Sequence, residues 1–127
     1  MLIKSKHILI VDDQASVRRI LKNLLKQLGC EWVDEVESAA AAIEAMEIKE
    51  YSLVIADWTM EPVSGLDLLK QIRGHETLGK VPFIMVASQT KPEHVLAAKE
   101  LGVNGYIVKP FNAEVLKNRI TAIFGSF

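Results

Sequence analysis

Three carboxylates and one lysine directly follow short apolar runs of the chain, and side chains of these types could do chemistry together. Asp12 and Asp13 follow the first such run, Asp57 the third and Lys109 the fifth. Carboxylates a few ångströms apart repel one another, so each raises the pKa of its neighbours unless a cation neutralises them. Lys109 supplies one positive charge, and a hard divalent ion such as Mg²⁺ or Mn²⁺ prefers oxygen ligands. An aspartate beside such an ion can attack a phosphoryl group as a nucleophile, because the metal and the lysine neutralise charge on the transferring oxygens.

The elements that must position these residues alternate strictly along the chain. Nearly continuous apolar runs predict strands, and apolar residues spaced by three and four predict helices. Ser38 and Asn112 are suited to cap helix N-termini, and Pro92 is suited to a first helical turn. The predicted strands cover residues 7–11, 32–36, 53–56, 83–86 and 105–108, and the predicted helices cover about residues 14–28, 38–48, 66–74, 92–101 and 112–124.

This pattern predicts an α/β fold in one domain over residues 1–127, with a doubly wound five-stranded parallel sheet built from five β-α units. Strands that are apolar along their whole length are buried on both faces, so helices must cover either side. With the strand order 2-1-3-4-5, the first, third and fifth strands end at one edge, where the three carboxylates and Lys109 would meet. The alternative interpretation is that the strand-end acids merely cap helices or lie in solvated turns.

The composition argues against several classes of function. Fifteen Lys and Arg against sixteen Asp and Glu give a formal charge of −1, which does not indicate direct nucleic-acid binding. The single cysteine, Cys30, cannot form an intrachain disulfide, as is usual for a reduced cytosolic protein, and it is interpreted as a packed thiol. The apolar run before Asp12 is too short for a signal-peptide core or a membrane span. We therefore expect a soluble, cytoplasmic protein that makes no membrane contact.

Three motifs connect the chain with a known family. They are ILIVDDQASVRRIL, DWTMEPVSGLDLLKQIR and GYIVKPF. In this order and at these separations they resemble the receiver domain of two-component response regulators, over about residues 7–124. The resemblance is greatest to single-domain receivers of the CheY type, because Asp57-Trp58, Tyr106 and Phe111 also fit and no output domain follows in this sequence. It implies the flavodoxin- and CheY-like fold. It also implies a phosphoacceptor signalling protein that catalyses only its own phosphotransfer and dephosphorylation, and so is not an enzyme in the usual sense.

The resemblance implies a role for each residue at the strand ends. Asp57 would accept the phosphoryl group from a sensor histidine kinase or a phosphotransfer protein. Asp12 and Asp13, with Asp57 and the backbone carbonyl of Thr59, would hold Mg²⁺, or alternatively Mn²⁺. Asp13 would bind the ion directly and Asp12 largely through water. Lys109 would pair with the phosphate.

The match fails at the end of the fourth strand. Receivers normally carry a Thr or Ser there, whose hydroxyl bonds the phosphoryl oxygen, whereas this chain has Ala87, which has no donor. Ser88 follows, but side chains alternate along a strand, so Ser88 is expected to point elsewhere unless the backbone bends. Two hypotheses stay open: the protein is phosphorylated but switches weakly, or Ser88 has taken over. Tyr106 would be the aromatic switch that turns inward with the phosphate, and its alternative reading is an exposed strand aromatic.

Two residues flanking the site, Thr59 and Gln89, occupy positions that tune phosphate lifetime in the family. Neither is charged, so neither can orient an attacking water strongly, and we expect no unusually fast hydrolysis. Glu61 stands where many receivers have proline. Its carboxylate would either influence access of the phosphodonor or be an ordinary solvated loop acid.

Because no output domain follows, the signal would leave through a surface that binds a downstream protein. In the family this surface is formed by the fourth helix, the fifth strand and the fifth helix. Here it would be modestly basic and suited to an acidic or amphipathic partner segment. Its residues would be Lys91, His94, Val95, Lys99, Tyr106, Lys117 and Arg119.

Three other interpretations fit the sequence less well. A phosphatase of the haloacid dehalogenase class also uses a strand-end aspartate, but it needs a second acid two residues later, where this chain has Thr59. A flavodoxin-like mononucleotide binder would offer glycines and hydroxyls to a phosphate, whereas Asp12 and Asp13 would repel one. A pseudo-receiver, which keeps the fold as an interaction module independent of phosphorylation, is supported only by Ala87 and stays the principal alternative.

Overall fold

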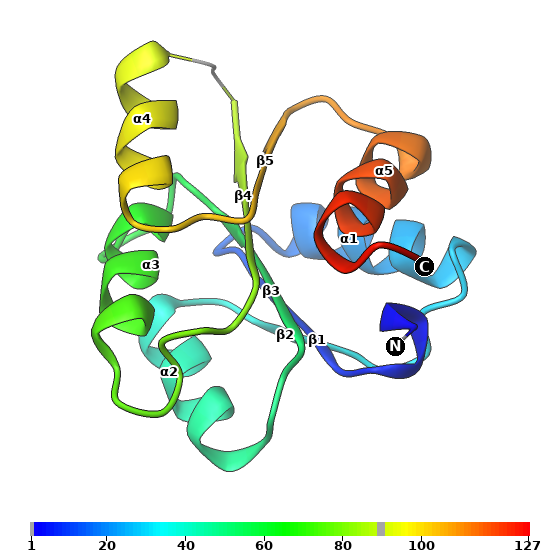
Figure 1. Ribbon diagram of the computed structural model, residues 1–127, viewed down its shortest axis with the longest axis horizontal. Coiled ribbons are helices and arrows are strands. Elements are labelled where there is room, and N and C mark those ends of the chain that lie inside the picture. Colours follow the sequence, from blue (N-terminus) through cyan, green and yellow to red (C-terminus); the bar gives the residue numbers. More distant parts are fainter. Residues whose placement is uncertain (1, 89–90) are drawn as a thin grey trace.

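The computed structural model describes residues 2–88 and 91–127 and has the predicted alternation of strands and helices (Figure 1). The strands are β1 (Ile8–Val11), β2 (Val33–Val36), β3 (Leu53–Asp57), β4 (Phe83–Ala87) and β5 (Gly105–Val108). The helices are α1 (Ala15–Gln27), α2 (Ala39–Ile48), α3 (Gly65–Gly74), α4 (Pro92–Glu100) and α5 (Ala113–Phe124), and a 3-10 helix (Ile3–Ser5) precedes β1.

The five strands form one parallel sheet in the order β2-β1-β3-β4-β5, which confirms the predicted fold and strand order. Helices α1 and α5 cover one face, and α2, α3 and α4 cover the other (Figure 1). Odd and even residues of a strand therefore meet different helices. In β1, Ile8 and Ile10 pack in the cluster that contains Leu21 of α1 and Leu116 of α5, while Leu9 packs in the opposite cluster with α2 and α3.

Full burial on both faces, which the sequence predicted for strands that read as nearly continuous apolar runs, holds for three of the five strands. All residues of β1, β3 and β4 are buried, whereas β2 and β5 are half-exposed along most of their length because they form the two edges of the sheet. Two strands also begin one residue later than predicted, since His7 and Trp32 lie outside β1 and β2. The three central strands hold the core, and their ends are consequently fixed on both sides.

The helix starts confirm two predicted caps. Ser38 accepts a hydrogen bond from the backbone N–H of Ala41 at 3.1 Å, and Asn112 accepts one from Val115 at 2.9 Å. Each cap satisfies one of the N–H groups that a helix start leaves without a partner, typically contributing about 1 kcal/mol. Within the part of the chain that the structure describes, no helix combines the length and the apolar character needed to span a bilayer.

Candidate functional site

The ends of β1, β3 and β5 bring Asp12, Asp57 and Lys109 together. Val11 of β1 pairs with Ala56 of β3, so the next residues, Asp12 and Asp57, end adjacent strands. Both aspartates are buried, with exposed fractions of 0% and 5%. The Lys109 ammonium lies 3.2 Å from Asp57 Oδ2 and donates a hydrogen bond to it. The structure therefore places a buried carboxylate pair beside one cation.

Two oxygens of this pair have no hydrogen-bond partner among the described residues. They are Asp12 Oδ2 and Asp57 Oδ1, and each is shielded from solvent. Burial is the main reason that the pKa of Asp12 is raised from 3.8 to about 6, and the nearby Asp57 carboxylate raises it further. The backbone N–H of Gln14, which donates to Asp12 Oδ1 at 2.9 Å, and the charge of Lys109 oppose this rise. Unpaired carboxylate oxygens that are shielded from solvent would find a partner in a hard divalent cation, which prefers oxygen ligands.

The third carboxylate is arranged differently. Asp13 is exposed, and its Oδ2 accepts a hydrogen bond of 3.3 Å from the backbone N–H of Glu61. Over residues 2–88 and 91–127, no three His, Cys, Asp or Glu side chains are grouped closely enough to make a metal cluster by themselves. Mg²⁺ takes few protein ligands and keeps several waters. Asp12 and Asp57, with the predicted further ligands Asp13 and the Thr59 carbonyl, therefore make the sparse set of oxygen ligands that Mg²⁺ accepts.

Backbone contacts fix the position of Asp57. The N–H of Trp58 donates to the Val86 carbonyl at 2.8 Å, so the chain stays paired with β4 immediately after Asp57. The N–H of Gly65 donates to the Trp58 carbonyl at 2.9 Å and closes the following loop. A Cβ at Gly65 would overlap the carbonyl oxygen of Asp57, so only glycine permits this close approach. The Lys109 N–H donates to the Ala87 carbonyl at 2.8 Å and aligns the lysine with the same edge.

Replacing Asp12 with asparagine is expected to stabilise the metal-free protein at neutral pH. The folded pKa of Asp12 lies above the unfolded value, so this group costs stability progressively as the pH rises from about 4 to about 6, and the full cost remains above that range. On this scale, Asp12→Asn would raise the free energy of unfolding by about 1–3 kcal/mol at neutral pH, and the gain would vanish near pH 4. Urea unfolding of the variant and the wild type in EDTA, from pH 4 to neutral pH, measures this difference in the free energy of unfolding. A variant less stable than the wild type at neutral pH would contradict the assignment.

The end of β4 forms part of a hollow of about 310 Å³ lined by Trp58, Thr59, Ala87, Ser88 and His94. Ala87, the last residue of β4, is buried and Ser88 is exposed, and both contribute to the same hollow. Gln89, predicted to tune phosphate lifetime, lies outside the described residues.

Four of the seven residues of the predicted partner surface line one hollow, and the other three lie outside it. A hollow of about 340 Å³ is lined by Val95, Lys99, Tyr106 and Arg119, with three residues that precede Tyr106. Lys91 and Lys117 are exposed but do not line it. The four lining residues come from α4, β5 and α5, so part of the predicted surface forms one continuous, basic-edged depression.

His94, another of the seven predicted partner-surface residues, lines the first of these hollows. Its ring stacks on Trp58 with centroids 4.6 Å apart and an interplanar angle of 13°. The other neighbour of Trp58 is Tyr106, whose ring meets it edge-on at 6.5 Å. Tyr106 is half-buried, and burial raises its pKa. Tyr106 is therefore packed against Trp58 on one side, and three rings connect α4, the end of β3, and β5.

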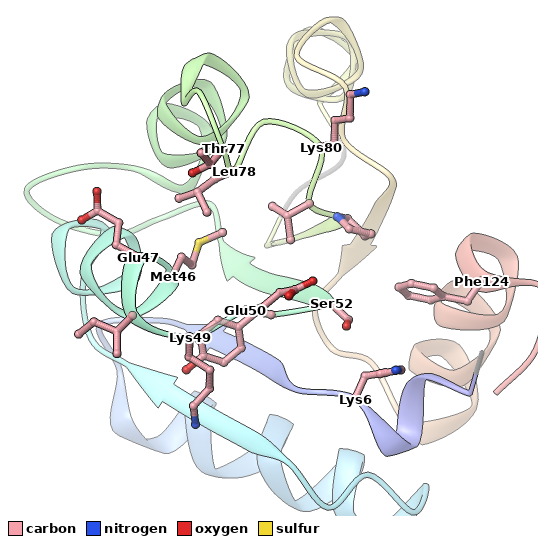
Figure 2. Close-up of a pocket in the computed structure, with 14 residues that line it drawn as sticks. Lys6, Met46, Glu47, Lys49, Glu50, Ser52, Thr77, Leu78, Lys80 and Phe124 are labelled. Atoms are coloured by element: carbon pink, nitrogen blue, oxygen red, sulfur yellow. The ribbon is translucent and has the colours of Figure 1, made fainter.

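A hollow larger than these two lies elsewhere. It has a volume of about 660 Å³ and lies at the other end of the sheet, where Met46, Ser52, Leu78 and Phe124 are among its lining residues (Figure 2). None of the four strand-end residues lines it. Cavity size is therefore no guide to the site here, whereas buried, unpaired carboxylate oxygens are.

Two features were missed by reasoning from sequence. The Trp58–His94 stack joins residues on different elements, and no spacing along the chain predicts it. Arg18 donates a hydrogen bond of 2.7 Å to the backbone carbonyl of Asp12. Arg18 could have been identified from the sequence, because it is a cation in the first turn of the helix that follows Asp12 and Asp13.

Comparison with known proteins agrees with this geometry. Residues 8–121 match the family described as the response regulator receiver domain. The chain is 42% identical to chemotaxis protein CheY-3 of Vibrio cholerae over 121 residues, which are 95% of this chain and 93% of that protein. It is 41% identical to chemotaxis protein CheY of Pseudomonas aeruginosa over 117 residues, which are 92% and 94% of the two chains. Among solved structures, chemotaxis response regulator CheY4 of Vibrio cholerae superposes with a TM-score of 0.85 at 26% identity, over 94% of this chain and 98% of that one.

Proposed function

Since the chain belongs to the response regulator receiver domain family, and hence to the proteins of two-component signalling, we propose that Asp57 is its phosphate acceptor. The donor is a sensor histidine kinase or a phosphotransfer protein, and the reaction depends on Mg²⁺, with Mn²⁺ as a substitute. The signal passes to a downstream protein through the surface formed by α4, β5 and α5. The protein acts as one receiver domain in the cytoplasm.

The observation that supports this proposal best is the burial and hydrogen bonding of the Asp57 carboxylate. Its carboxylate is buried, one oxygen accepts a hydrogen bond from Lys109, and the other has no partner among the described residues. A carboxylate in this environment is held in one orientation and is poorly solvated, so it is prepared for attack. A structural aspartate would be expected to have both oxygens satisfied.

Each residue has a defined part in the proposed reaction. A carboxylate oxygen of Asp57 forms a bond to phosphorus as the bond from phosphorus to the donor breaks, and the donor leaves with the electron pair. Lys109 neutralises charge on the transferring group. Asp12, Asp13, Asp57 and the Thr59 carbonyl would hold Mg²⁺, which would supply further neutralisation of the phosphoryl oxygens when bound.

Intact-mass analysis tests the metal dependence of the proposal. The protein is incubated with acetyl phosphate in MgCl₂, in MnCl₂ and in EDTA. We expect one phosphoryl group to be added with either metal and none in EDTA. No adduct with either metal, and none with a panel of histidine kinases, would favour the pseudo-receiver, the alternative that Ala87 supports.

Ala87→Thr is expected to strengthen switching. Phosphorylation itself is expected to proceed with or without the substitution. A hydroxyl at this buried position would add one hydrogen bond to a charged phosphoryl oxygen, about 1.5–3 kcal/mol. That corresponds to an increase of about ten- to a hundredfold in the ratio of active to inactive states. Nuclear magnetic resonance of Tyr106 in the phosphorylated protein measures the population of its inward rotamer.

Ser88→Ala separates the two open hypotheses about switching. If the protein switches weakly, Ser88→Ala leaves the Tyr106 population unchanged and Ala87→Thr raises it. If Ser88 has taken over, Ser88→Ala lowers the population and Ala87→Thr adds little. An Ala87→Thr variant that leaves the Tyr106 population unchanged, combined with no effect of Ser88→Ala, would contradict both.

A further inference from the structure

Arg18 of α1 connects the ends of two strands behind the proposed metal site. Its Nη1 donates to the backbone carbonyl of Asp12 at 2.7 Å, and its Nε donates to Glu35 Oε1 of β2 at 2.9 Å. The Arg18 side chain is only 16% exposed. The hydrogen bond from Arg18 is the main reason that the pKa of Glu35 is lowered, so Glu35 is ionised and holds the guanidinium. The rigid fork of an arginine is what makes both contacts available at once.

These contacts act on the peptide that carries Asp12. The Asp12 N–H donates to the Val36 carbonyl at 3.2 Å, and Asp12 Oδ1 accepts from Gln14 N–H at 2.9 Å. With Arg18 on the carbonyl, the backbone on both sides of the side chain and one carboxylate oxygen are all fixed. Only Asp12 Oδ2 is left without a partner, and it is buried. Arg18 thus constrains Asp12 while its own charged group is directed at the backbone.

We propose that Arg18, held by Glu35, is a positioning residue that keeps Asp12 oriented for Mg²⁺. The inference rests on the proposed function, because the metal is part of it. This proposal and simple electrostatics predict opposite changes in Mg²⁺ affinity when Arg18 is replaced. Removing a nearby positive charge should tighten binding of a cation, whereas losing the orientation of a ligand should weaken it. Residues that orient metal ligands typically change metal affinity about 10- to 100-fold when they are replaced.

Urea unfolding of the full chain at a series of MgCl₂ concentrations, at constant ionic strength, tests the proposal. A ligand that binds only the folded state stabilises it in proportion to its affinity, so one set of curves gives both the metal-free stability and the Mg²⁺ dissociation constant. The variants are Arg18→Ala and Arg18→Met, the latter keeping much of the aliphatic stem if the alanine variant does not fold. Arg19→Ala is the matched control, since Arg19 is an exposed neighbour on the same helix and carries the same charge.

We expect the Arg18 variants to raise the Mg²⁺ dissociation constant about tenfold or more, while Arg19→Ala leaves it unchanged or slightly lower. Glu35→Ala should weaken binding in the same direction, and combining it with Arg18→Ala should add little, because the two residues act as a unit. Arg18 variants that bind Mg²⁺ as tightly as Arg19→Ala, or more tightly, would overturn the inference and leave the proposed function intact. A wild-type protein whose stability does not respond to Mg²⁺ would refute the metal in the proposed function, and this inference with it.

Discussion

Asparagine in place of Asp57 is expected to abolish phosphoryl acceptance completely. The amide preserves the size of the side chain but lacks the charge and nucleophilicity that attack phosphorus requires. Asp57 is buried at the end of β3 and is followed by Trp58, and the residue before it is Ala56, which has no hydroxyl to substitute for it. The mass of the protein after incubation with acetyl phosphate and Mg²⁺ should therefore be that of the unmodified chain.

The matched control for this variant is Asp67→Asn, an exposed acid in the first turn of α3. It should be phosphorylated as the wild type is, since it lies outside the proposed site. An adduct that persists in Asp57→Asn would assign the chemistry to another residue, of which Thr59 is the nearest hydroxyl in sequence. That result would remove the basis of the proposed function and not merely modify it.

Replacing Lys109 with alanine has the second largest expected effect, a fall of about 10²- to 10³-fold in the rate of phosphorylation. Removing one preorganised donor aimed at developing charge typically costs this much. Lys109 is the cation that contacts Asp57, at 3.2 Å, and its backbone is held in place by Ala87. The time course of adduct formation at saturating Mg²⁺ measures the rate.

Two further variants give this result its meaning. Lys109→Arg retains the charge on a longer, forked group and should recover only part of the rate. Lys117→Ala removes an exposed lysine of α5 and should leave the rate unchanged. A rate for Lys109→Ala within about threefold of the wild type would show that the lysine does not act in the transition state.

The architecture could be predicted because every level of the sequence agreed on it. Apolar runs, caps such as Ser38 and Asn112, and a charged residue at the end of three strands all favoured the same alternating fold. Since the carboxyl ends of parallel strands share one edge of the sheet, the meeting of Asp12, Asp57 and Lys109 followed from strand order alone. The structure has this arrangement.

The details of the site depend on contacts between elements, and these could not be read from spacing. Asp12 and Asp13 look equivalent in sequence, yet one is buried and the other is exposed and hydrogen-bonded to the Glu61 backbone. His94 is predicted to belong to the partner surface, and nothing in its spacing along the chain indicated that it also stacks on Trp58. The burial of a side chain and its ring contacts depend on residues from other elements, so local sequence patterns do not predict them.

The most direct measurement of the central claim is to locate the phosphoryl group on the chain. The protein is phosphorylated with acetyl phosphate and Mg²⁺, treated with sodium borohydride, which reduces an aspartyl phosphate to homoserine, and digested for peptide mass spectrometry. We predict one reduced residue, at Asp57, with Asp12 and Asp13 unmodified. Homoserine at another aspartate, or a borohydride-resistant phosphoryl group on a hydroxyl side chain, would contradict the assignment of Asp57 as the acceptor.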